Sequence, residues 1–383
     1  MPKSSSEITT RTERQGRSVS AGALIAIIAA ALLAIAALLW FTALRGISDK
    51  RVEAPPAQTP SAAAADEQDE SPAAPPQIVT ATDPEPPAQT EPADAPEAGE
   101  PDGDASVQPA GAFDGAPAAE TDATQTLNLQ LYSENAILID VETNTVIAEK
   151  APDARIYPAS MTKIMTALVA CEQIENWDDT FRMTQTIIDP LYLADATLAG
   201  FVNGEDVNML DLVYGTILPS GAEATEALAI QLAGSEEAFV ELMNEKAAEL
   251  GLQDTHFVDA SGLHDEEHYT TVRDMSIILR AAMENEVCRQ VLSTASYTSA
   301  STEQHPDGVD MYNKFLLRVA SADQNGAQIQ GAKTGYTAQA MNCCASFGRS
   351  PSGRQLLCVT AHAWTGDFCI EDHIALYSTY NGE

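Results

Sequence analysis

The stretch Tyr157-Pro-Ala-Ser-Met-Thr-Lys163 marks the point at which a strand-like pattern gives way to a helical one. Proline is favoured at the start of a helix, so Pro158 places Ser160 in the first turn. Lys163 follows three residues later, and side chains at this spacing share a helix face. A neutral amine beside a hydroxyl can take its proton, and the free N–H groups of a helix start point at whatever the hydroxyl attacks. The stretch predicts a serine nucleophile with a lysine base, although a capping Ser beside a surface Lys has the same spacing.

Strand-like patterns enclose this helical region on both sides. An apolar hairpin is predicted around the polar turn 142–145, and helical spacing begins near residue 161 and continues to about 283. A last helix is expected at about 370–380. The predicted strands are 136–140, 146–148, 343–347 and 356–361. Because strands at both ends flank helices, the sequence predicts an α+β fold whose sheet is built from chain-distant pieces.

An uncharged apolar run extends over residues 19–44. As a helix it would span ~39 Å, which exceeds a ~30 Å hydrocarbon core. Trp40 and Phe41 lie near one end, as in interfacial aromatic belts. We expect residues 1–18 to be a cytoplasmic tail and residues 19–44 a transmembrane signal anchor in the lipid bilayer. The alternatives are a cleaved signal peptide, whose apolar region is typically ~7–15 residues, and a buried soluble helix, which would carry a polar stripe.

Residues 45–126 form an acidic segment rich in Pro and Ala, with no Lys or Arg after Arg51. Such a composition buries too little apolar surface to fold, so we expect a disordered linker. The chain of 383 residues has a formal net charge of -36, which excludes nucleic acid as a partner because that polyanion requires clustered Lys and Arg. Residues 127–383 remain as one block of a size typical of a single domain or two interlocked subdomains.

Two further motifs follow in this block: Ser220-Gly-Ala222 and Lys333-Thr-Gly335. The order S-x-x-K, S-x-(N), K-T-G resembles the penicillin-binding and serine β-lactamase superfamily. Shorter phrases make the block most similar to the D-alanyl-D-alanine carboxypeptidases, which are low-molecular-mass penicillin-binding proteins. Those phrases are Tyr157-Pro-Ala-Ser160, Asp254-Thr-His-Phe257, Gly262-Leu-His264, Tyr269-Thr-Thr271, Asp274-Met275 and Gly335-Tyr-Thr337. The resemblance covers about residues 130–380.

The resemblance implies a β-lactamase/transpeptidase-like fold, with an antiparallel sheet flanked by helices and an inserted, mainly helical subdomain. It implies a serine-type carboxypeptidase that removes the terminal D-alanine from peptidoglycan stem pentapeptides through an acyl-enzyme. β-Lactam antibiotics would be covalent inhibitors, and no metal or other cofactor would take part. The block at 127–383 would be the extracytoplasmic catalytic domain of a single-pass protein of the cell membrane.

The same resemblance assigns the catalytic roles. Ser160 would be the nucleophile, Lys163 its base, and Ser220 the group that relays a proton toward the leaving D-alanine. The family usually has Asn at the third position of the middle motif, where this chain has Ala222. That Asn helps to hold the substrate amide and the lysine, and whether the adjacent Glu223 replaces it is left open.

The substrate-binding roles fall on the third motif. By the resemblance, Lys333 and Thr334 would hold the substrate carboxylate on an edge strand. The backbone N–H groups of Ser160 and Tyr336 would form an oxyanion hole. The remaining binding positions are Gly335 and Thr337. Family members often carry an Arg just before the last helix that helps to bind the carboxylate, and residues 364–370 contain none.

Two other functions compete with the carboxypeptidase. A serine β-lactamase would need a deacylating base, typically a Glu on a loop after the middle motif, and residues 252–263 offer only Asp254 and Asp259. A catalytically weak protein that binds or scaffolds the cell wall is suggested by Ala222 and the missing Arg. Release of D-alanine would separate the three.

Two features invite a metal or disulfide interpretation. His264-Asp-Glu-Glu-His268 matches an inverted zinc-protease pattern, but that pattern requires a helix, and the flanking residues favour a loop. Six cysteines occur without a CxxC pair or zinc-like spacing. Cys343 and Cys344 would point to opposite faces of a strand, so they cannot readily pair, and the disulfide pairing is left open.

Overall fold

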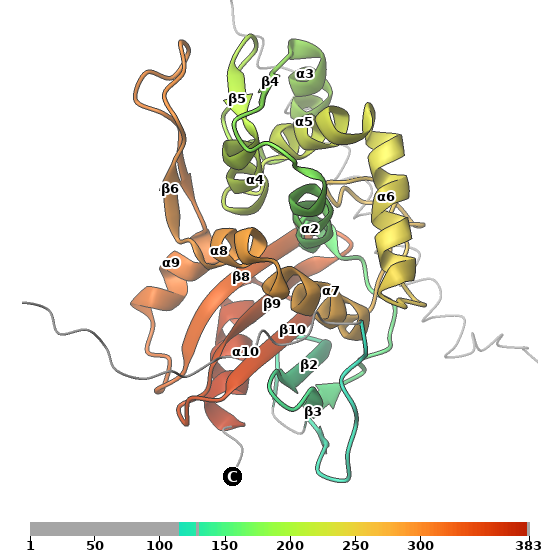
Figure 1. Cartoon of the computed structure of the whole chain (residues 1–383). Coiled ribbons are helices and arrows are strands. Elements are labelled where there is room, and N and C mark those ends of the chain that lie inside the picture. Colours follow the sequence, from blue (N-terminus) through green and yellow to red (C-terminus); the bar gives the residue numbers. More distant parts are fainter. Residues whose placement is uncertain (1–114, 128–129, 381–383) are drawn as a thin grey trace, which may run out of the picture. The chain divides into compact units, whose positions relative to one another are not determined.

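The computed structural model describes residues 115–127 and 130–380 (Figure 1). The predicted tail, the signal anchor and residues 45–114 of the predicted linker lie outside the described residues. Within the described ranges, no helix is both long and apolar enough to cross a membrane.

A six-stranded sheet carries the fold, with the order β1-β3-β2-β10-β9-β8 (Figure 1). Both predicted strand pairs are present and antiparallel, and β8 is an edge strand that contains the Lys333 motif. The prediction of an antiparallel sheet holds for every pair except β1 and β3, which are parallel. The strands are β1 (Gln125–Thr126), β2 (Asn135–Asp140), β3 (Thr145–Lys150), β8 (Gln328–Thr337), β9 (Met341–Arg349) and β10 (Gln355–Ala363).

Both faces of the sheet are covered, which explains why β2 is buried along its whole length. Ile137 and Ile139 point into one apolar core, and Ala136 and Leu138 point into the other, as the two-residue period of a strand requires. Helices α7 and α8 pack on the first face, with α2 packed against both of them, and α9 and α10 pack on the second. Their bounds are α2 (Lys163–Gln173), α7 (Val272–Glu284), α8 (Glu286–Ser293), α9 (Lys314–Ser321) and α10 (Gly366–Thr379).

A mainly helical lobe is inserted between β3 and β8, as the resemblance implied (Figure 1). Helix α2 packs between the lobe and the helices α7 and α8 that cover the sheet, and its first eight residues are buried. The lobe includes α3 (Gln185–Leu193), α4 (Met209–Ile217), α5 (Ala222–Ala233) and α6 (Glu236–Glu249). Two small hairpins complete it, formed by β4 (Thr180–Arg182) with β5 (Asp206–Asn208) and by β6 (Ser296–Thr298) with β7 (Asp310–Tyr312).

The ordered block begins earlier than the sequence predicted. Residues 115–126 were assigned to the linker, but Gln125 and Thr126 form β1 against β3, and Ala119 bridges to Thr145. The attachment uses backbone hydrogen bonds to an otherwise open strand edge, which composition does not reveal. Residues 115–126 therefore belong to the folded block.

The cysteine and histidine patterns resolve as structural features. Cys343 and Cys344 point into different cores, as predicted for neighbours on a strand, and all six cysteines are free thiols. The segment from His264 to His268 is a loop, with His264 exposed and His268 buried against Thr162. The zinc-protease geometry, which needs a helix, is therefore not formed.

We predict that Gly331→Ala destabilises the sheet beside the Lys333 motif. A Cβ at Gly331 would lie 2.2 Å from Cζ of Phe347, so the ring must move. Overpacking of this kind costs about 1–3 kcal/mol. Denaturant unfolding should show that loss, whereas Gly366→Ala, whose Cβ would meet its nearest atom at 3.6 Å, should unfold like the parent chain. Equal stability of the two variants would contradict the packing argument.

Candidate active site

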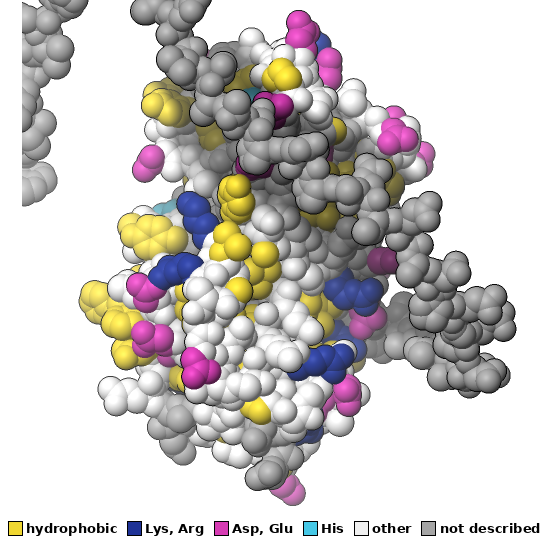
Figure 2. Space-filling view, turned by 90° about the vertical axis from the view of Figure 1, so that its left-hand side faces the viewer, with side chains coloured by type: hydrophobic (Ala, Val, Ile, Leu, Met, Phe, Trp, Pro, Cys, Tyr) yellow, Lys and Arg dark blue, Asp and Glu magenta, His cyan; other side chains and the backbone are white. Residues whose placement is uncertain are grey.

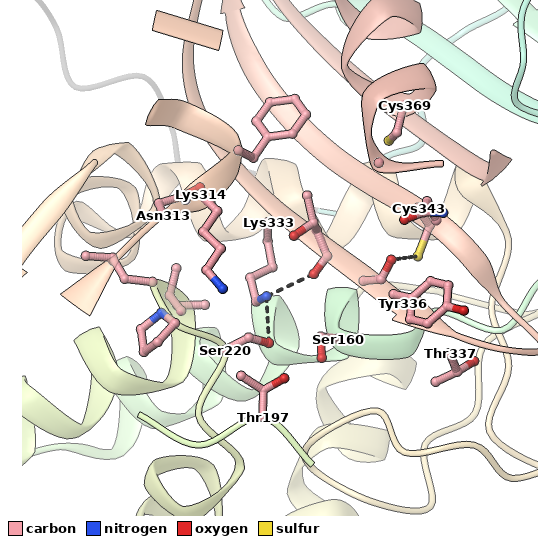
Figure 3. A pocket seen from close by; sticks show the side chains of 18 of the residues that line it. Ser160, Thr197, Ser220, Asn313, Lys314, Lys333, Tyr336, Thr337, Cys343 and Cys369 are labelled. Atoms are coloured by element: carbon pink, nitrogen blue, oxygen red, sulfur yellow. Dashed lines mark hydrogen bonds between the residues drawn. The ribbon is translucent and has the colours of Figure 1, made fainter. Parts of the chain in front are cut away.

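A cavity of about 550 Å³ opens between the helical lobe and the edge strand β8 (Figure 3). Residues far apart in the sequence line it, including Ser160, Ser220 and residues 333–337. The three sequence motifs therefore meet at one place, although they come from three different segments of the chain.

Ser160 and Lys163 lie in contact where a short 3-10 turn, η1 (Ala159–Thr162), runs into α2. Lys163 Nζ is 3.2 Å from Ser160 Oγ and donates a 2.6 Å hydrogen bond to the carbonyl of Ser261. The lysine is fully buried, and this desolvation lowers its pKa to about 8, although nearby acids such as Asp259 oppose the shift. A neutral amine is therefore accessible near neutral pH, as a base requires.

A second lysine and serine pair faces the first. Ser220 lies in the turn between α4 and α5, and Lys333 Nζ donates to its Oγ at 2.9 Å and to the carbonyl of Thr334 at 2.9 Å (Figure 3). Burial is the main cause, and the positive charge of Lys163 the second, that together lower the pKa of Lys333 to about 7. Ser220 has a φ of 69°, a left-handed conformation that costs a non-glycine residue energy and often occurs at functional sites.

Two glycines allow the segments to approach each other. A Cβ at Gly335 of β8 would lie 2.9 Å from the backbone nitrogen of Ser160, so only glycine lets the edge strand come this close. A Cβ at Gly262, where φ is 84°, would lie 1.9 Å from the carbonyl oxygen of Ala159. The backbone N–H of Ser160 thus borders β8 just before Tyr336, the arrangement that the predicted oxyanion hole requires.

Tyr336 and Thr337 line the cavity at the end of β8, and the Tyr336 ring is 66% exposed at the rim. Thr334 is exposed on the same strand. All eight residues predicted for the site therefore lie around one cavity or, for Lys163, in direct contact with a residue that lines it.

At the third position of the middle motif, where the family usually has Asn, neither Ala222 nor the adjacent Glu223 offers an amide to the cavity. Ala222 is buried at the start of α5, and its N–H donates to the carbonyl of Thr197. Glu223 Oε1 accepts hydrogen bonds from the backbone N–H groups of Gly200 and Phe201, and burial raises its pKa. Glu223 does not line the cavity, so it does not replace the missing amide.

The acids between 252 and 263 are likewise unsuited to a deacylating role. Asp259 accepts hydrogen bonds from the N–H groups of Ser261 and Gly262, which fixes the loop whose carbonyl contacts Lys163. Asp254 is exposed, and neither acid lines the cavity.

Sequence reasoning missed several cavity residues. Thr197 reaches the cavity beside Ser220 (Figure 3). Asn313, Lys314 and Arg318 come from the region at the start of α9 and within it. None of these residues belongs to a motif. The only signal in the sequence is that Lys314 and Arg318 are two basic residues close together in an otherwise acidic chain.

One group of side chains within residues 115–127 and 130–380 is close enough to hold a metal: Cys344, Cys369 and His373. Both ring nitrogens of His373 are already hydrogen-bonded, to the hydroxyls of Ser346 and Thr360 at 2.7 and 2.9 Å. The groups that meet at Ser160 are instead hydroxyls and amines, a set suited to acyl transfer through a serine ester.

Known proteins resemble this chain in sequence. The profile of the Peptidase S11 family, described as D-alanyl-D-alanine carboxypeptidase, matches residues 120–363. D-alanyl-D-alanine carboxypeptidase DacF of Bacillus subtilis is 30% identical over 244 residues, which are 63% of this chain and 60% of that protein. DacA of Escherichia coli is 32% identical over 220 residues, 55% of this chain and 51% of that protein. The chain thus spans less than two thirds of these relatives.

The fold comparison agrees with the sequence comparison. The crystal structure of the Streptomyces K15 DD-transpeptidase has a TM-score of 0.59 and 27% identity, and the match covers 65% of this chain and 97% of that one. Penicillin binding protein 5 from Haemophilus influenzae has a TM-score of 0.58 and 25% identity, with 65% and 71% of the two chains covered. These matches bear out the transpeptidase-like α+β fold.

We predict that Lys163→Met stabilises the protein at pH 7 by about 1–3 kcal/mol, because it removes a poorly compensated buried amine. The amine has a pKa of 10.5 when exposed and about 8 when folded, so the unfolded chain binds more protons between these pH values. The stability of the parent chain should therefore rise with pH over this window, and the rise should be smaller in the variant.

Thermal or denaturant unfolding between pH 7 and 10 measures both effects. Lys314→Met removes an exposed lysine and should leave stability nearly unchanged. Lower stability of Lys163→Met at pH 7 would show that the contact with Ser261 outweighs the desolvation of the amine.

Proposed function

The chain belongs to the D-alanyl-D-alanine carboxypeptidase family, and on this basis we propose that it removes the terminal D-alanine from peptidoglycan stem pentapeptides through a serine acyl-enzyme. The observation that carries the proposal is the contact between Ser160 and the buried Lys163, in a cavity that also holds Ser220 and Lys333. The chemistry follows from the protonation states that burial favours.

In the acylation step, Ser160 Oγ attacks the carbonyl carbon of the scissile peptide while neutral Lys163 takes the hydroxyl proton. The backbone N–H groups of Ser160 and Tyr336 stabilise the negative oxygen of the tetrahedral intermediate. Ser220 passes its proton to the leaving nitrogen and is reprotonated by Lys333, whose Nζ already donates to it. The C–N bond breaks, D-alanine leaves, and the rest of the peptide remains as an ester of Ser160.

Water then attacks the ester from the side that D-alanine vacated and gives a proton through Ser220 to the neutral Lys333. The ester C–O bond breaks, Ser160 Oγ takes back the proton held by Lys163, and the shortened peptide leaves with a new carboxyl group. A β-lactam would acylate Ser160 in the same way, but its leaving nitrogen stays attached through the opened ring and blocks that approach. We therefore propose that penicillins inhibit this protein as persistent acyl adducts. The β-lactamase alternative lacks support, since Glu223 and Asp259 hold backbone N–H groups and neither lines the cavity.

The substitution at Ala222 does not by itself favour a scaffolding role. An Asn at that position would help to hold the lysine, and here the carbonyl of Ser261 accepts the 2.6 Å hydrogen bond from Lys163. Loss of the amide contact to the substrate would lower activity without removing the acylating groups.

We also propose that residues 19–44 anchor the chain in the cell membrane and that the block acts outside the cytoplasm. The uncharged apolar run supports the anchor, and the extracytoplasmic position of peptidoglycan supports the location. Stem peptides and the bilayer would be the partners of the protein.

Penicillin should add its mass to Ser160, and Ser160→Ala should abolish both the adduct and the release of D-alanine from a pentapeptide. Peptide mapping by mass spectrometry locates the adduct, and a D-alanine assay measures turnover. An adduct on another residue, or equal release by the variant, would exclude the mechanism, and rapid nitrocefin turnover would favour the β-lactamase.

The acylation rate at saturating penicillin should rise about tenfold per pH unit below the pKa of Lys163, near 8, and level off above it, because only the neutral amine accepts the proton. The bound carboxylate raises the pKa of Lys333 and keeps that residue charged over this range. Stopped-flow or quenched acylation from pH 6 to 9 measures the profile. A flat profile would remove Lys163 from the role of base.

A further inference from the structure

Basic side chains are concentrated at the cavity, against the composition of the chain. The sequence has 20 basic and 56 acidic residues, yet the cavity is lined by Lys314, Arg318 and Lys333 and by one acid, Asp195. Figure 2, which views the side of the molecule where α9 lies in Figure 1, shows Lys and Arg side chains beside apolar ones on that face. The cavity is therefore a local positive region on an acidic protein, which favours an anionic ligand.

Lys314 is placed where helix electrostatics disfavour it. It is the first residue of α9, the first turn contains no acid, and the N-terminal end of a helix already carries partial positive charge. Its side chain is exposed and directed into the cavity on the side of Lys333 (Figure 3). Among the described residues no salt bridge to it is found. A lysine and a helix N-terminus directed at one space together attract an anion.

Arg318 follows four residues later and shares a helix face with Lys314. Its guanidinium pairs with Asp367 at the start of α10, and the two side chains are 50% and 66% exposed. Exposed pairs of this kind contribute little stability, so a ligand carboxylate can compete for the guanidinium.

The start of α9 is fixed to the edge strand next to Lys333. Asn313 Nδ2 donates to the carbonyl of Ala332 at 2.9 Å, and Asn313 Oδ1 caps the helix by accepting from the N–H of Leu316. Ser160 borders β8 further along, at Gly335. Along β8, α9 therefore lies at the Lys333 and Ser220 end of the cavity, the end toward which the leaving residue departs.

We propose that Lys314 and Arg318 form a subsite for the C-terminal carboxylate of the leaving residue, in addition to Lys333 and Thr334. This proposal rests on the proposed carboxypeptidase function. Residues 364–370, where family members often carry an Arg for the carboxylate, contain no basic residue here. Helix α9 instead supplies the guanidinium of Arg318, which lies beside this segment at Asp367. The subsite would select peptides that end in a free carboxylate.

Paired substrates test the proposal: a D-alanyl-D-alanine peptide and the methyl ester of its terminal carboxylate. Arg318→Ala and Lys314→Ala should each lower kcat/KM for the free acid about tenfold, mainly through KM, as loss of a charge-assisted contact predicts. Neither should change kcat/KM for the ester. Arg182→Ala is the matched control, because Arg182 pairs with Asp206 on the surface with similar exposure, 66% and 54%, and it should change neither value.

Asp367→Asn separates ligand binding from a structural role. It frees the Arg318 guanidinium, so kcat/KM for the free acid should stay the same or rise, whereas a merely structural pair would give the same loss as Arg318→Ala. Equal losses on acid and ester, or no loss on either, would overturn the proposal. The proposal would also be overturned if the effect of the variants disappeared when a side-chain carboxylate of the peptide was amidated and persisted when its C-terminus was esterified.

Failure of the proposed carboxypeptidase function can be distinguished from failure of the subsite by measuring acylation instead of D-alanine release. If the parent chain releases D-alanine from neither peptide, its acylation by penicillin and by penicillin methyl ester still tests the subsite. The ratio of the acylation rate with penicillin to that with its methyl ester should be about tenfold smaller in Arg318→Ala than in the parent chain, which would support the subsite even if the protein does not turn over peptides. An unchanged ratio would exclude the subsite.

Discussion

The site depends on the close approach of the edge strand β8 to the 3-10 turn that carries Ser160. Gly335 permits it, because a Cβ there would collide with the backbone of Pro158 and Ser160, and Gly262 likewise lets the loop that contacts Lys163 approach the same turn. The close packing excludes water from the amines of Lys163 and Lys333, and this desolvation is the largest cause of their lowered pKa values. One packing contact therefore sets both the position of the nucleophile and the basicity of its neighbour.

The features that make the site reactive also lower the stability of the fold there. Two amines are buried close together at the cavity, the charge of Lys163 lowers the pKa of Lys333, and Ala159 and Ser220 adopt left-handed backbone conformations. Residues held in such conformations persist only where the surrounding structure enforces them. Here the two apolar cores on either side of the sheet, and the loop fixed by Asp259, supply that support.

The fold was largely predictable because its periodic patterns are strong. The hairpin at β2 and β3, the pair β9 and β10 and the last helix all follow from apolar spacing, although α10 begins at Gly366 and not near residue 370. The attachment of residues 115–126 was not predictable, since β1 is held by backbone groups and its side chains are exposed. An edge pairing of this kind leaves no mark in the hydrophobic pattern.

The pairing of Ser160 with Lys163 was predictable from the sequence, because the two residues are three apart on one turn and local geometry alone brings them together. Ser220 and Lys333 could be named only by resemblance, and their 2.9 Å contact joins residues 113 positions apart. Three features could not be predicted before the chain segments were placed in space. The carbonyl of Ser261 accepts the hydrogen bond from Lys163, Glu223 binds backbone N–H groups away from the cavity, and α9 brings Lys314 and Arg318 to the cavity. The reason is physical: contacts within one helical turn are fixed by backbone spacing, whereas contacts between distant segments depend on how whole helices and strands pack.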